Sequence, residues 1–493
     1  MMRGALVAVL LAFFVSGAIR PIRAQTVRAT GITSIQVIQV RPLVIDSVPL
    51  SEAPGEDLIR RTADGRLVRC VTGELVCRYT RSAERETVAP LIQDMDVNVW
   101  GFGRGIRAYA QLRTRTSLGG DAALWPRADD RFDALAAFVE LDRERFRLRG
   151  GRQWKTSGLG YYNFDGVTAL YRAMPGLTIE MFGGWSLARS LNEPRTSEAI
   201  AAVEAFAPDK RALLLGAQAW YRPSLAFSIG GLYQREIRSD RLGLYSERIA
   251  LDAAYRFARG SLSATLETDV AAREINDARL TASYGLRPDI TVNAYGRIYE
   301  PFFELWTIWG VFDPVGFREV GGGATWRTMT ETPVEVSLDF SRRSYADASA
   351  STVFGSYSTD GWNAALTGSF RASPAWLVQG AYRIDLGFGA ARSEATFRVE
   401  RGLSQDMHVG ASVVGFERQF EFRVAEGTVW GLGLDGRLRL GDRGRVSGSV
   451  SSYRHFGAAG IPDVDWSQFR GMLRFEWTVG PEPGLPASPG GRP

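Results

Sequence analysis

Lysine, histidine and cysteine are all scarce in this chain. Of its 59 basic residues only Lys155 and Lys210 are lysines, and there are two histidines and two cysteines. The arginines are scattered singly among 54 acidic residues, which argues against nucleic-acid binding. The two cysteines lack CxxC spacing and have no histidine near them, so we expect no metal site and no cofactor.

Long apolar runs are also missing after the first residues. Arg3 precedes an apolar run from Ala5 to Ile19 that is too short for a membrane helix, which is typical of a signal peptide over residues 1–24. Cleavage is expected after Ala24, with Ala18 as the alternative. Beyond residue 25 no apolar run reaches 18 residues, which argues against a membrane protein built of helices.

The composition instead suits a membrane β-barrel. Hydrophobic residues make up 45% of the chain and the mean hydropathy is −0.11, values that resemble those of a soluble protein. A barrel can have this composition because only every second residue of a strand faces lipid. A secreted chain of this kind is expected in the outer membrane of a bacterium, with outer-membrane lipid as its surroundings.

The stretch from Arg131 to Arg172 shows the unit that repeats along the chain. Between residues 135 and 142 one set of alternate residues is apolar while the other includes Glu140 and Asp142, as in a strand with two unlike faces. The polar turn Asp142–Arg145 then reverses the chain into a second alternating strand, and a longer loop leads to a third.

Twenty candidate strands of this kind, the first at residues 96–116, fill residues 93–480 and are joined alternately by short turns and longer loops. Outer-membrane barrels show this alternation, with the short turns on the periplasmic side. We therefore predict an all-β fold, a transmembrane antiparallel up-and-down β-barrel of about 18–20 strands with both termini periplasmic. Residues 481–493 have the composition of a disordered tail.

Residues 25–92 differ from the repeat and are predicted to form a small N-terminal periplasmic extension. A β-branched run, Ile32–Ile45, is broken by Pro42, and a small hairpin follows at Arg66–Thr80. The barrel is expected to begin only after this extension, at residue 93.

The hairpin of the extension contains both cysteines. If Cys70 and Cys77 pair across its strands, Gly73 and Glu74 fall at the two central turn positions, and glycine at the first of these suits a type II′ turn. In an oxidising compartment we expect a structural disulfide. A redox-active or metal-binding pair is the alternative.

Arginines near the start of the barrel form the first candidate site. They are Arg107, Arg113 and Arg115 on one strand and Arg147 and Arg149 two strands further along. Facing the lumen, they would line a pore that favours anions, and their guanidinium groups would suit carboxylates. In the alternative, they pair with acids such as Asp133 and Glu140 in rigid networks of the wall.

One segment resembles a known family. The sequence Arg147–Val167 contains Gly151-Arg152-Gln153, a glycine at 158 or 160, and Phe164-Asp165-Gly166. It is similar to the "GRQ … G … FDG" stretch of outer-membrane porins of the alginate-export type. The resemblance implies a monomeric porin barrel whose arginine-rich lumen passes anionic polymers or small solutes.

The aromatic loop Tyr299–Phe317 is a second candidate. Folded inward, it would act as a constriction loop that sets acids against the arginine wall or offers stacking faces for sugars; an apolar lid on the barrel rim is the alternative. The constriction residues would be Glu300, Glu304, Trp306, Trp309 and Asp313. A third loop, Ala188–Arg211, contains a predicted short amphipathic helix with Ser197 as its cap.

Enzymatic activity is not expected. Asp406-Met407-His408 has the Asp-x-His spacing of omptin-type proteases but lies beside a turn placed on the periplasmic rim, and His455 lacks such a pair. Two functions remain. One is a porin-like channel for small anionic or polar solutes; the other is a structural barrel that scaffolds a periplasmic or lumenal protein partner.

Overall fold

The computed structural model describes most of the chain after residue 25. The described residues are 26–40, 43–55, 59–63, 67–71, 73–82, 84–103, 105–119, 131–187, 193–194, 212–238, 246–300, 303–304, 316–345, 359–387, 390–420, 427–457 and 465–481. Among them, no helix is both long and apolar enough to cross a membrane.

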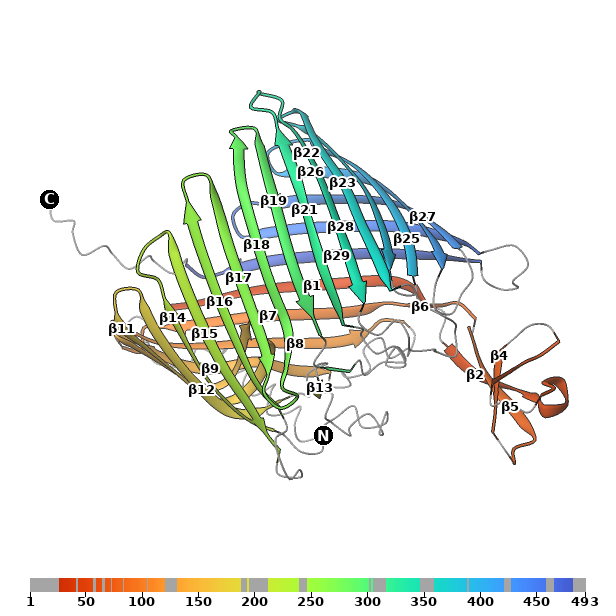
Figure 1. Ribbon diagram of the computed structural model, residues 1–493, viewed down its shortest axis with the longest axis horizontal. Coiled ribbons are helices and arrows are strands. Elements are labelled where there is room, and N and C mark those ends of the chain that lie inside the picture. Colours follow the sequence, from red (N-terminus) through yellow and green to blue (C-terminus); the bar gives the residue numbers. More distant parts are fainter. Residues whose placement is uncertain are drawn as a thin grey trace.

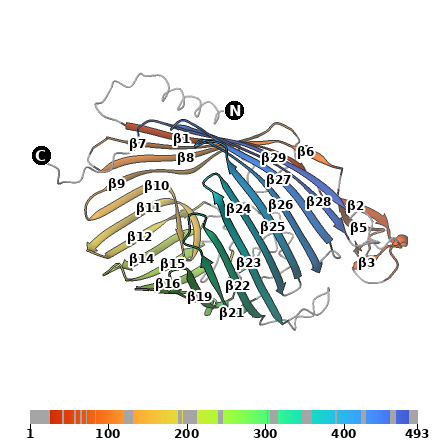
Figure 2. The same ribbon diagram turned by 90° about the horizontal axis from the view of Figure 1, so that it is seen from above.

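A closed antiparallel barrel of 22 strands dominates the structure (Figures 1 and 2). Consecutive wall strands pair with one another, and β1 closes the ring by pairing with β29 on one side and β7 on the other. The first eleven wall strands are β1 (Thr26–Val40), β7 (Pro90–Trp100), β8 (Ile106–Ser117), β9 (Phe132–Asp142), β10 (Phe146–Ser157), β11 (Gly160–Met174), β12 (Leu177–Ser186), β14 (Leu213–Tyr221), β15 (Phe227–Ile237), β16 (Ser246–Phe257) and β17 (Gly260–Asp269). The others are β18 (Glu274–Arg287), β19 (Ile290–Tyr299), β21 (Phe317–Arg327), β22 (Val334–Tyr345), β23 (Asp360–Ser373), β24 (Trp376–Gly387), β25 (Ala390–Gly402), β26 (Met407–Phe420), β27 (Gly427–Leu440), β28 (Gly444–Gly457) and β29 (Trp466–Val479).

The predicted antiparallel barrel is thus confirmed, but it has more strands than the 18–20 expected. Residues 96–116, expected as one strand, belong to the two strands β7 and β8, with a turn between them in which Gly101 and Gly105 have φ angles of 102° and 72°. The second addition is β1, which was assigned to the extension. Its run of β-branched residues does not alternate with charged ones, so its sequence does not show that one face meets lipid.

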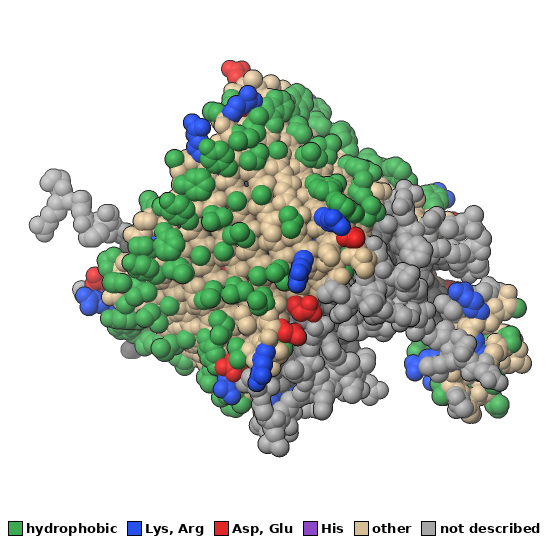
Figure 3. All heavy atoms as spheres, viewed as in Figure 1, with side chains coloured by type: hydrophobic (Ala, Val, Ile, Leu, Met, Phe, Trp, Pro, Cys, Tyr) green, Lys and Arg blue, Asp and Glu red, His purple; other side chains and the backbone are tan. Residues whose placement is uncertain are grey.

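The outer face of the barrel is apolar. On β9, Val139 is 56% exposed while its neighbour Glu140 is 1% exposed, because the two side chains point to opposite sides of the wall. Figure 3 shows hydrophobic side chains spread over the outer face formed by the middle strands, with charged side chains toward its edges.

Aromatic residues mark the two edges of this apolar face. Trp362 pairs with Leu386, which is ten residues from Trp376 at the other end of β24. At about 3.3 Å per residue and a strand tilt of about 40°, the two tryptophans bound an apolar band about 25 Å tall. This height matches the hydrocarbon layer that a membrane barrel crosses.

The barrel has a rim of short turns and a rim of longer connections. The turn 143–145 between β9 and β10 lies beside the β7–β8 turn, since the Asp142 amide donates to the Gly105 carbonyl at 2.7 Å. Thr26 pairs with Trp100 and Ala29 with Val479. Both ends of the barrel therefore lie at the short-turn rim.

A separate small sheet stands outside the barrel wall, inserted between β1 and β7 (Figure 1). Its strands are β2 (Leu43–Pro49), β3 (Ile59–Arg61), β4 (Leu67–Cys70) and β5 (Val76–Ser82), in the order β2-β5-β4-β3. A one-turn 3-10 helix, η1 (Leu50–Glu52), follows β2, and β6 (Glu86–Val88) pairs with the end of β1 on the way back to the wall. Because β1 leaves the barrel at Val40, this sheet rises from the rim of long connections, opposite the rim that holds both barrel ends. The expected extension at the short-turn side, over residues 25–92, is therefore wrong in its start and in its side of the barrel.

The predicted disulfide between Cys70 and Cys77 is confirmed. The two cysteines form a small buried core with Ala53 and Val68. The turn differs from the expected one, because the Glu74 amide donates to the Val71 carbonyl at 3.0 Å. Gly73, with φ 92°, therefore takes the second central position of the turn instead of the first.

Candidate functional site

Arginine–carboxylate pairs are distributed around the inner face of the wall. Because the inner residues of neighbouring strands lie opposite one another, arginines and acids that alternate with lipid-facing residues meet across strands. Besides one lysine pair, Lys155–Glu180, the inner pairs include Arg113–Asp94, Arg248–Glu267, Arg297–Asp277, Arg343–Glu319, Arg398–Asp435 and Arg437–Glu400.

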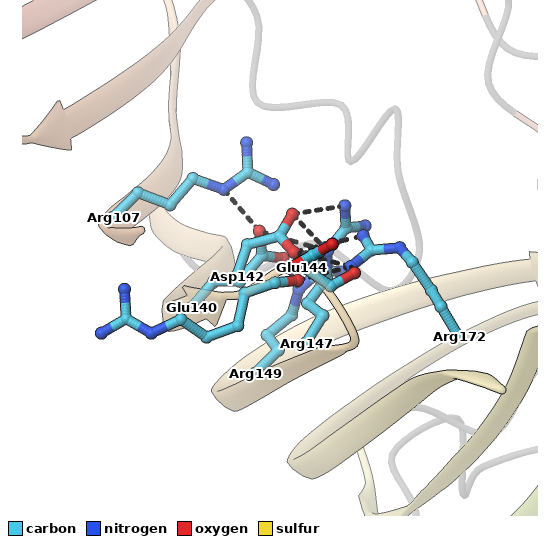
Figure 4. A network of polar contacts seen from close by, with 8 residues as sticks. Arg107, Glu140, Asp142, Glu144, Arg147, Arg149 and Arg172 are labelled. Carbon is cyan, nitrogen blue, oxygen red and sulfur yellow. Dashed lines mark hydrogen bonds and ion pairs between the residues drawn. The ribbon is translucent and has the colours of Figure 1, made fainter. Parts of the chain in front are cut away.

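The densest cluster lies near the short-turn rim, around one buried carboxylate (Figure 4). The Glu140 carboxylate of β9 forms ion pairs with Arg107 of β8 and with Arg149 of β10. In each pair a guanidinium nitrogen lies 2.7 Å from a carboxylate oxygen. Arg147 of β10 lies 3.7 Å away. Three of the five arginines singled out in the sequence thus converge on Glu140, one of the acids named in the paired alternative.

A second carboxylate extends the cluster toward the turn. Arg147 also contacts Asp142 at 2.7 Å, and Arg172 of β11 reaches the same carboxylate at 3.1 Å. Arg172 donates in addition to the backbone carbonyl of Arg143 at 2.7 Å, which ties β11 to the turn. Arg172 was not selected from the sequence, because its partner lies thirty residues earlier and only the strand register brings the two together.

The cluster therefore has more arginines than acids. Four guanidinium groups, those of Arg107, Arg147, Arg149 and Arg172, share two carboxylates, so the two sets leave a net charge of +2. Arg107 remains 47% exposed on its side chain. The cluster is an ion-pair network of the wall, which agrees with the paired alternative derived from the sequence.

The remaining two arginines of the set lie away from this cluster. Arg113 forms a two-pronged pair with Asp94 of β7, with the second contact at 3.1 Å. Arg115 is half-buried and forms no ion pair within the described part of the chain. Its backbone amide donates to the Arg131 carbonyl at 2.9 Å.

The tip of the β10–β11 hairpin folds into the barrel and lies over the inner face of neighbouring wall strands. The sequence did not predict this feature. Arg248 of β16 donates from Nη1 to the Leu159 carbonyl at 2.9 Å, although three strands, β12, β14 and β15, separate β11 from β16. Tyr162 donates to the same carbonyl at 2.9 Å. At about 4.8 Å between strands, a tip that stayed in the wall could not reach β16.

The underside of this hairpin is packed against inner side chains. Leu159, Tyr162 and Phe164 form a buried apolar cluster with residues of four wall strands, namely Phe182, Leu214, Leu232 and Ala250. Apolar side chains on the inner face are thus covered by the hairpin instead of by water. The hairpin lines the inner wall from β12 to β16 and narrows the lumen there.

Residues Arg147–Val167 contain the hinge of this hairpin. Gly151 has φ 125°, and a Cβ there would lie 2.3 Å from the Ala137 carbonyl oxygen, so only glycine fits. The pairing of β9 with β10 ends one residue later, at Arg152. From that point the hairpin leaves β9 and turns inward.

Two polar side chains close the gap that this departure leaves at β9. The Arg152 guanidinium donates to the Ala134 carbonyl at 3.1 Å and pairs with Asp165 at 2.9 Å. Asn163 donates to the Leu135 carbonyl, also at 3.1 Å. Backbone carbonyls left without a strand partner therefore gain side-chain donors, as unpaired backbone groups away from water require.

Comparisons with known proteins add little at the level of sequence. No family model matches the chain. No curated protein matches it either. Similar solved structures include Acinetobacter baumannii OccAB1, with 9% identity, 94% of this chain and 99% of that chain covered, and a TM-score of 0.41. The outer membrane protein OprD from Pseudomonas aeruginosa has 9% identity, 92% and 93% coverage, and a TM-score of 0.38.

The predicted constriction loop lies only partly within the described residues. The Glu300 amide donates to the Asn276 carbonyl at 2.8 Å, and Glu304 belongs to the two-residue strand β20 (Phe303–Glu304). This strand pairs with β13 (Glu193–Pro194), so the connections after β12 and β19 meet. Trp306, Trp309 and Asp313 lie outside the described residues, as does the predicted helix of the 188–211 loop.

An aromatic and arginine cluster at the base of that loop was not selected from the sequence. The rings of Tyr299 and Tyr345 flank Phe317, with centroids 5.2 and 6.2 Å from it. The guanidinium groups of Arg297 and Arg343 lie 5.6 and 5.0 Å from the same ring. Alternation on each strand could have placed these residues on the inner face, but their proximity depends on the register across three strands.

The two histidines lie apart. His408 is on β26 near the short-turn rim, with Nδ1 3.5 Å from Glu400. His455 is on β28 near the opposite rim and stacks on Trp466 with ring centroids 5.3 Å apart. The structure therefore brings no second histidine to either one.

Proposed function

We propose that this protein is an outer-membrane channel that passes small anionic or polar solutes along a wall of arginines. The observation that carries the proposal is the surplus of positive charge near the short-turn rim, where four guanidinium groups share Glu140 and Asp142. A closed barrel with an apolar outer band gives these charges a wet interior, since arginine at the lipid face is costly.

The arrangement of the cluster suits reversible anion contact. The carboxylates hold the guanidinium groups in place, so little side-chain entropy is lost when an anion approaches. Their partial neutralisation keeps the site from binding anions too tightly, and conduction needs sites that a solute can both enter and leave. Planar guanidinium groups match carboxylate geometry in particular.

The inward hairpin supports selection by size as well as charge. It covers the inner face of β12 to β16 on one side of the lumen. The arginine cluster lies on β8 to β11, the strands next to it. Solutes would therefore pass the narrowed section and the arginines at different depths of the lumen, the first toward the long-connection rim and the second at the short-turn rim.

Reversal potentials in planar bilayers test the proposal. Under a potassium chloride gradient we expect the wild-type channel to prefer chloride, and Arg147→Glu/Arg149→Glu to shift the reversal potential toward that of a cation channel. Arg401→Glu is the matched control, because Arg401 lies on the outer face and stacks on Trp376 at 5.0 Å. Unchanged selectivity in the double variant would refute the arginine wall. A folded barrel that conducts nothing would point instead to a scaffold for a protein partner.

The proposed orientation places the short-turn rim and both chain ends in the periplasm. The disulfide sheet, on the opposite rim, would then face the outside of the cell. An epitope inserted at Gly73–Glu74 should be detected by antibody on intact cells, whereas an epitope after Gly480 should be detected only after permeabilisation. The reverse pattern would contradict this orientation.

A further inference from the structure

Two arginines interrupt the apolar outer face at the long-connection rim. Outer residues of neighbouring strands form rows across the wall, and the row nearest the rim runs Ile298–Arg318–Ser344. The next row contains Arg342, paired with Val320 on one side and Trp362 on the other. Both guanidinium groups therefore start from the side of the wall that faces the membrane.

The two arginines are diagonal neighbours. Arg318 pairs with Ser344, two residues after Arg342 on β22, so their Cα atoms are about 7–8 Å apart. At this spacing one anionic group with several oxygens can contact both guanidinium groups. Like charges this close on adjacent strands repel each other unless an anion lies between them.

Carboxylates also lie nearby: Asp360 beside Arg342, and Glu274 and Glu300, which line a hollow together with Arg318. Asp360 contacts Arg342 at 2.9 Å, with both side chains largely exposed. Exposed pairs of this kind contribute about 0–1 kcal/mol, so Asp360 can be displaced or share its partner.

A hollow beside Arg318 provides space for a headgroup. Its volume is about 460 Å³, and it lies at the end of the wall, lined by Ile275, Ile298 and Arg318 of the outer face and by the inner rings of Tyr299, Phe317 and Tyr345. The Glu300 carboxylate is turned toward Gly316, because a Cβ at that glycine would lie 1.9 Å from Oε2. This acid is thus directed toward the backbone at the end of the hollow.

The wall on the membrane side of the two arginines is apolar. Val320 is 72% exposed, and Leu338, Phe340 and Leu366 are exposed in the rows that follow. Trp362, whose ring lies 5.2 Å from the Arg342 guanidinium, stands where interfacial tryptophans usually lie. A molecule that fits this surface has an anionic head and long apolar chains.

We propose that Arg318 and Arg342 form a binding site for a phosphorylated lipid of the outer leaflet. The phosphate would accept hydrogen bonds from both guanidinium groups, and the acyl chains would lie along Val320, Phe340 and Leu338. The site rests on the membrane orientation of the proposed function, but it does not depend on conduction, because it lies on the other side of the wall from the lumen.

The opposite rim offers a matched control. Arg401 also faces outward and lies over a tryptophan, Trp376, at 5.0 Å. Unlike Arg318 and Arg342, Arg401 lies at the short-turn rim. There, no second outer arginine lies opposite it on the neighbouring strands β24 and β26. A charge reversal there alters the same chemistry at the other membrane surface.

Native mass spectrometry of the full barrel in phosphate-free detergent tests the site. The probes are lipid A with two phosphates, the same lipid without phosphates, and inorganic phosphate as a competitor. We expect the phosphorylated lipid to bind the wild type and Arg401→Glu alike, and to bind Arg318→Glu/Arg342→Glu at least about tenfold more weakly, since each charge-assisted contact is worth roughly that much. Arg318→Gln/Arg342→Gln should be intermediate.

Several outcomes would overturn the proposal. They are equal binding of the dephosphorylated lipid, full displacement by inorganic phosphate at low millimolar concentration, equal loss of binding in Arg401→Glu, or no binding to the wild type. Conductance separates this site from the proposed function. Arg318→Glu/Arg342→Glu should conduct as the wild type does, which also shows that the variant is folded. A wild-type barrel that conducts nothing but still binds the lipid would refute the channel and leave the lipid site intact.

Discussion

Nη1 of Arg248 lies 2.9 Å from the carbonyl oxygen of Leu159, joining the inner face of β16 to the tip of the β10–β11 hairpin. The same guanidinium contacts Glu267 at 3.0 Å and the Tyr162 hydroxyl at 3.3 Å. A side chain that is 1% exposed thus anchors the hairpin to β16, the fourth strand beyond its base in the wall.

A designed disulfide should lock the hairpin against the wall. A Cβ at Gly158 would lie 3.5 Å from the Ala250 Cβ, at the short end of the range that disulfides span. We expect Gly158→Cys/Ala250→Cys to form this bond spontaneously in the oxidising compartment, as shown by loss of thiol labelling and by peptide mass. Gly158→Cys/Ala253→Cys should keep both thiols free, because Ala253 points to the outer face of β16. Free thiols in the first variant would show that the hairpin is not folded inward.

Gly150 and Gly151, which are adjacent at the hinge, should differ sharply in how much their replacement by alanine destabilises the barrel. Gly151→Ala forces a φ of 125° on alanine and brings its Cβ against the Ala137 carbonyl, so we expect a loss of about 1–3 kcal/mol in unfolding free energy. A Cβ at Gly150 meets nothing within 4 Å, and Gly150→Ala should be close to neutral. Urea-dependent unfolding of the refolded barrel, followed by tryptophan fluorescence, measures both. Equal effects would mean that the close approach at Gly151 does not hold the hinge.

Loss of the shared carboxylate should make the channel both less stable and more anion-selective. Glu140→Gln leaves Arg107, Arg147 and Arg149 without their common partner, and we expect a loss of about 2 kcal/mol, at the low side for a buried pair because the arginines remain partly hydrated. Glu394→Gln removes the partner of the more exposed Arg392 and should change stability by less than about 1 kcal/mol. Unfolding curves and reversal potentials give the two readouts, and a shift of Glu140→Gln toward cations would contradict the assigned role of the cluster.

Removal of the disulfide should unfold the small sheet and spare the barrel. Closing the loop from Cys70 to Cys77 is worth roughly 2–3 kcal/mol in the chain-entropy model. The small core around Ala53 and Val68 has little else to offset that loss. In Cys70→Ser/Cys77→Ser we expect limited proteolysis to cut within residues 43–82 while the barrel still migrates as a folded species on unheated gels. If the variant is cut no faster than the wild type, the small core around Ala53 and Val68 is enough to keep the sheet folded without the disulfide.

Period-two alternation was enough to find most of the wall. The sequence indicates which face of a strand meets lipid where an apolar residue stands next to an acid, as Val139 does beside Glu140 and Leu251 beside Asp252. An arginine or acid cannot face acyl chains. The alternation of short turns with longer connections likewise set the strand directions. This alternation did not identify β1 as a wall strand, because its β-branched residues do not alternate with charged ones. Its place depends on the ladders that it forms with β7 and β29, near the two ends of the chain.

The sequence by itself determined the barrel class and the disulfide, because each follows from local spacing and elementary burial costs. Only the tertiary structure decided that Arg107, Arg147 and Arg149 share Glu140, that Arg172 joins them, and that the β10–β11 hairpin folds inward onto Arg248. The physical reason is that register and strand order bring together residues tens of positions apart, and the alternation along any one strand carries no information about its neighbours. The side on which the disulfide sheet stands was likewise decided by the path of β1 through the wall.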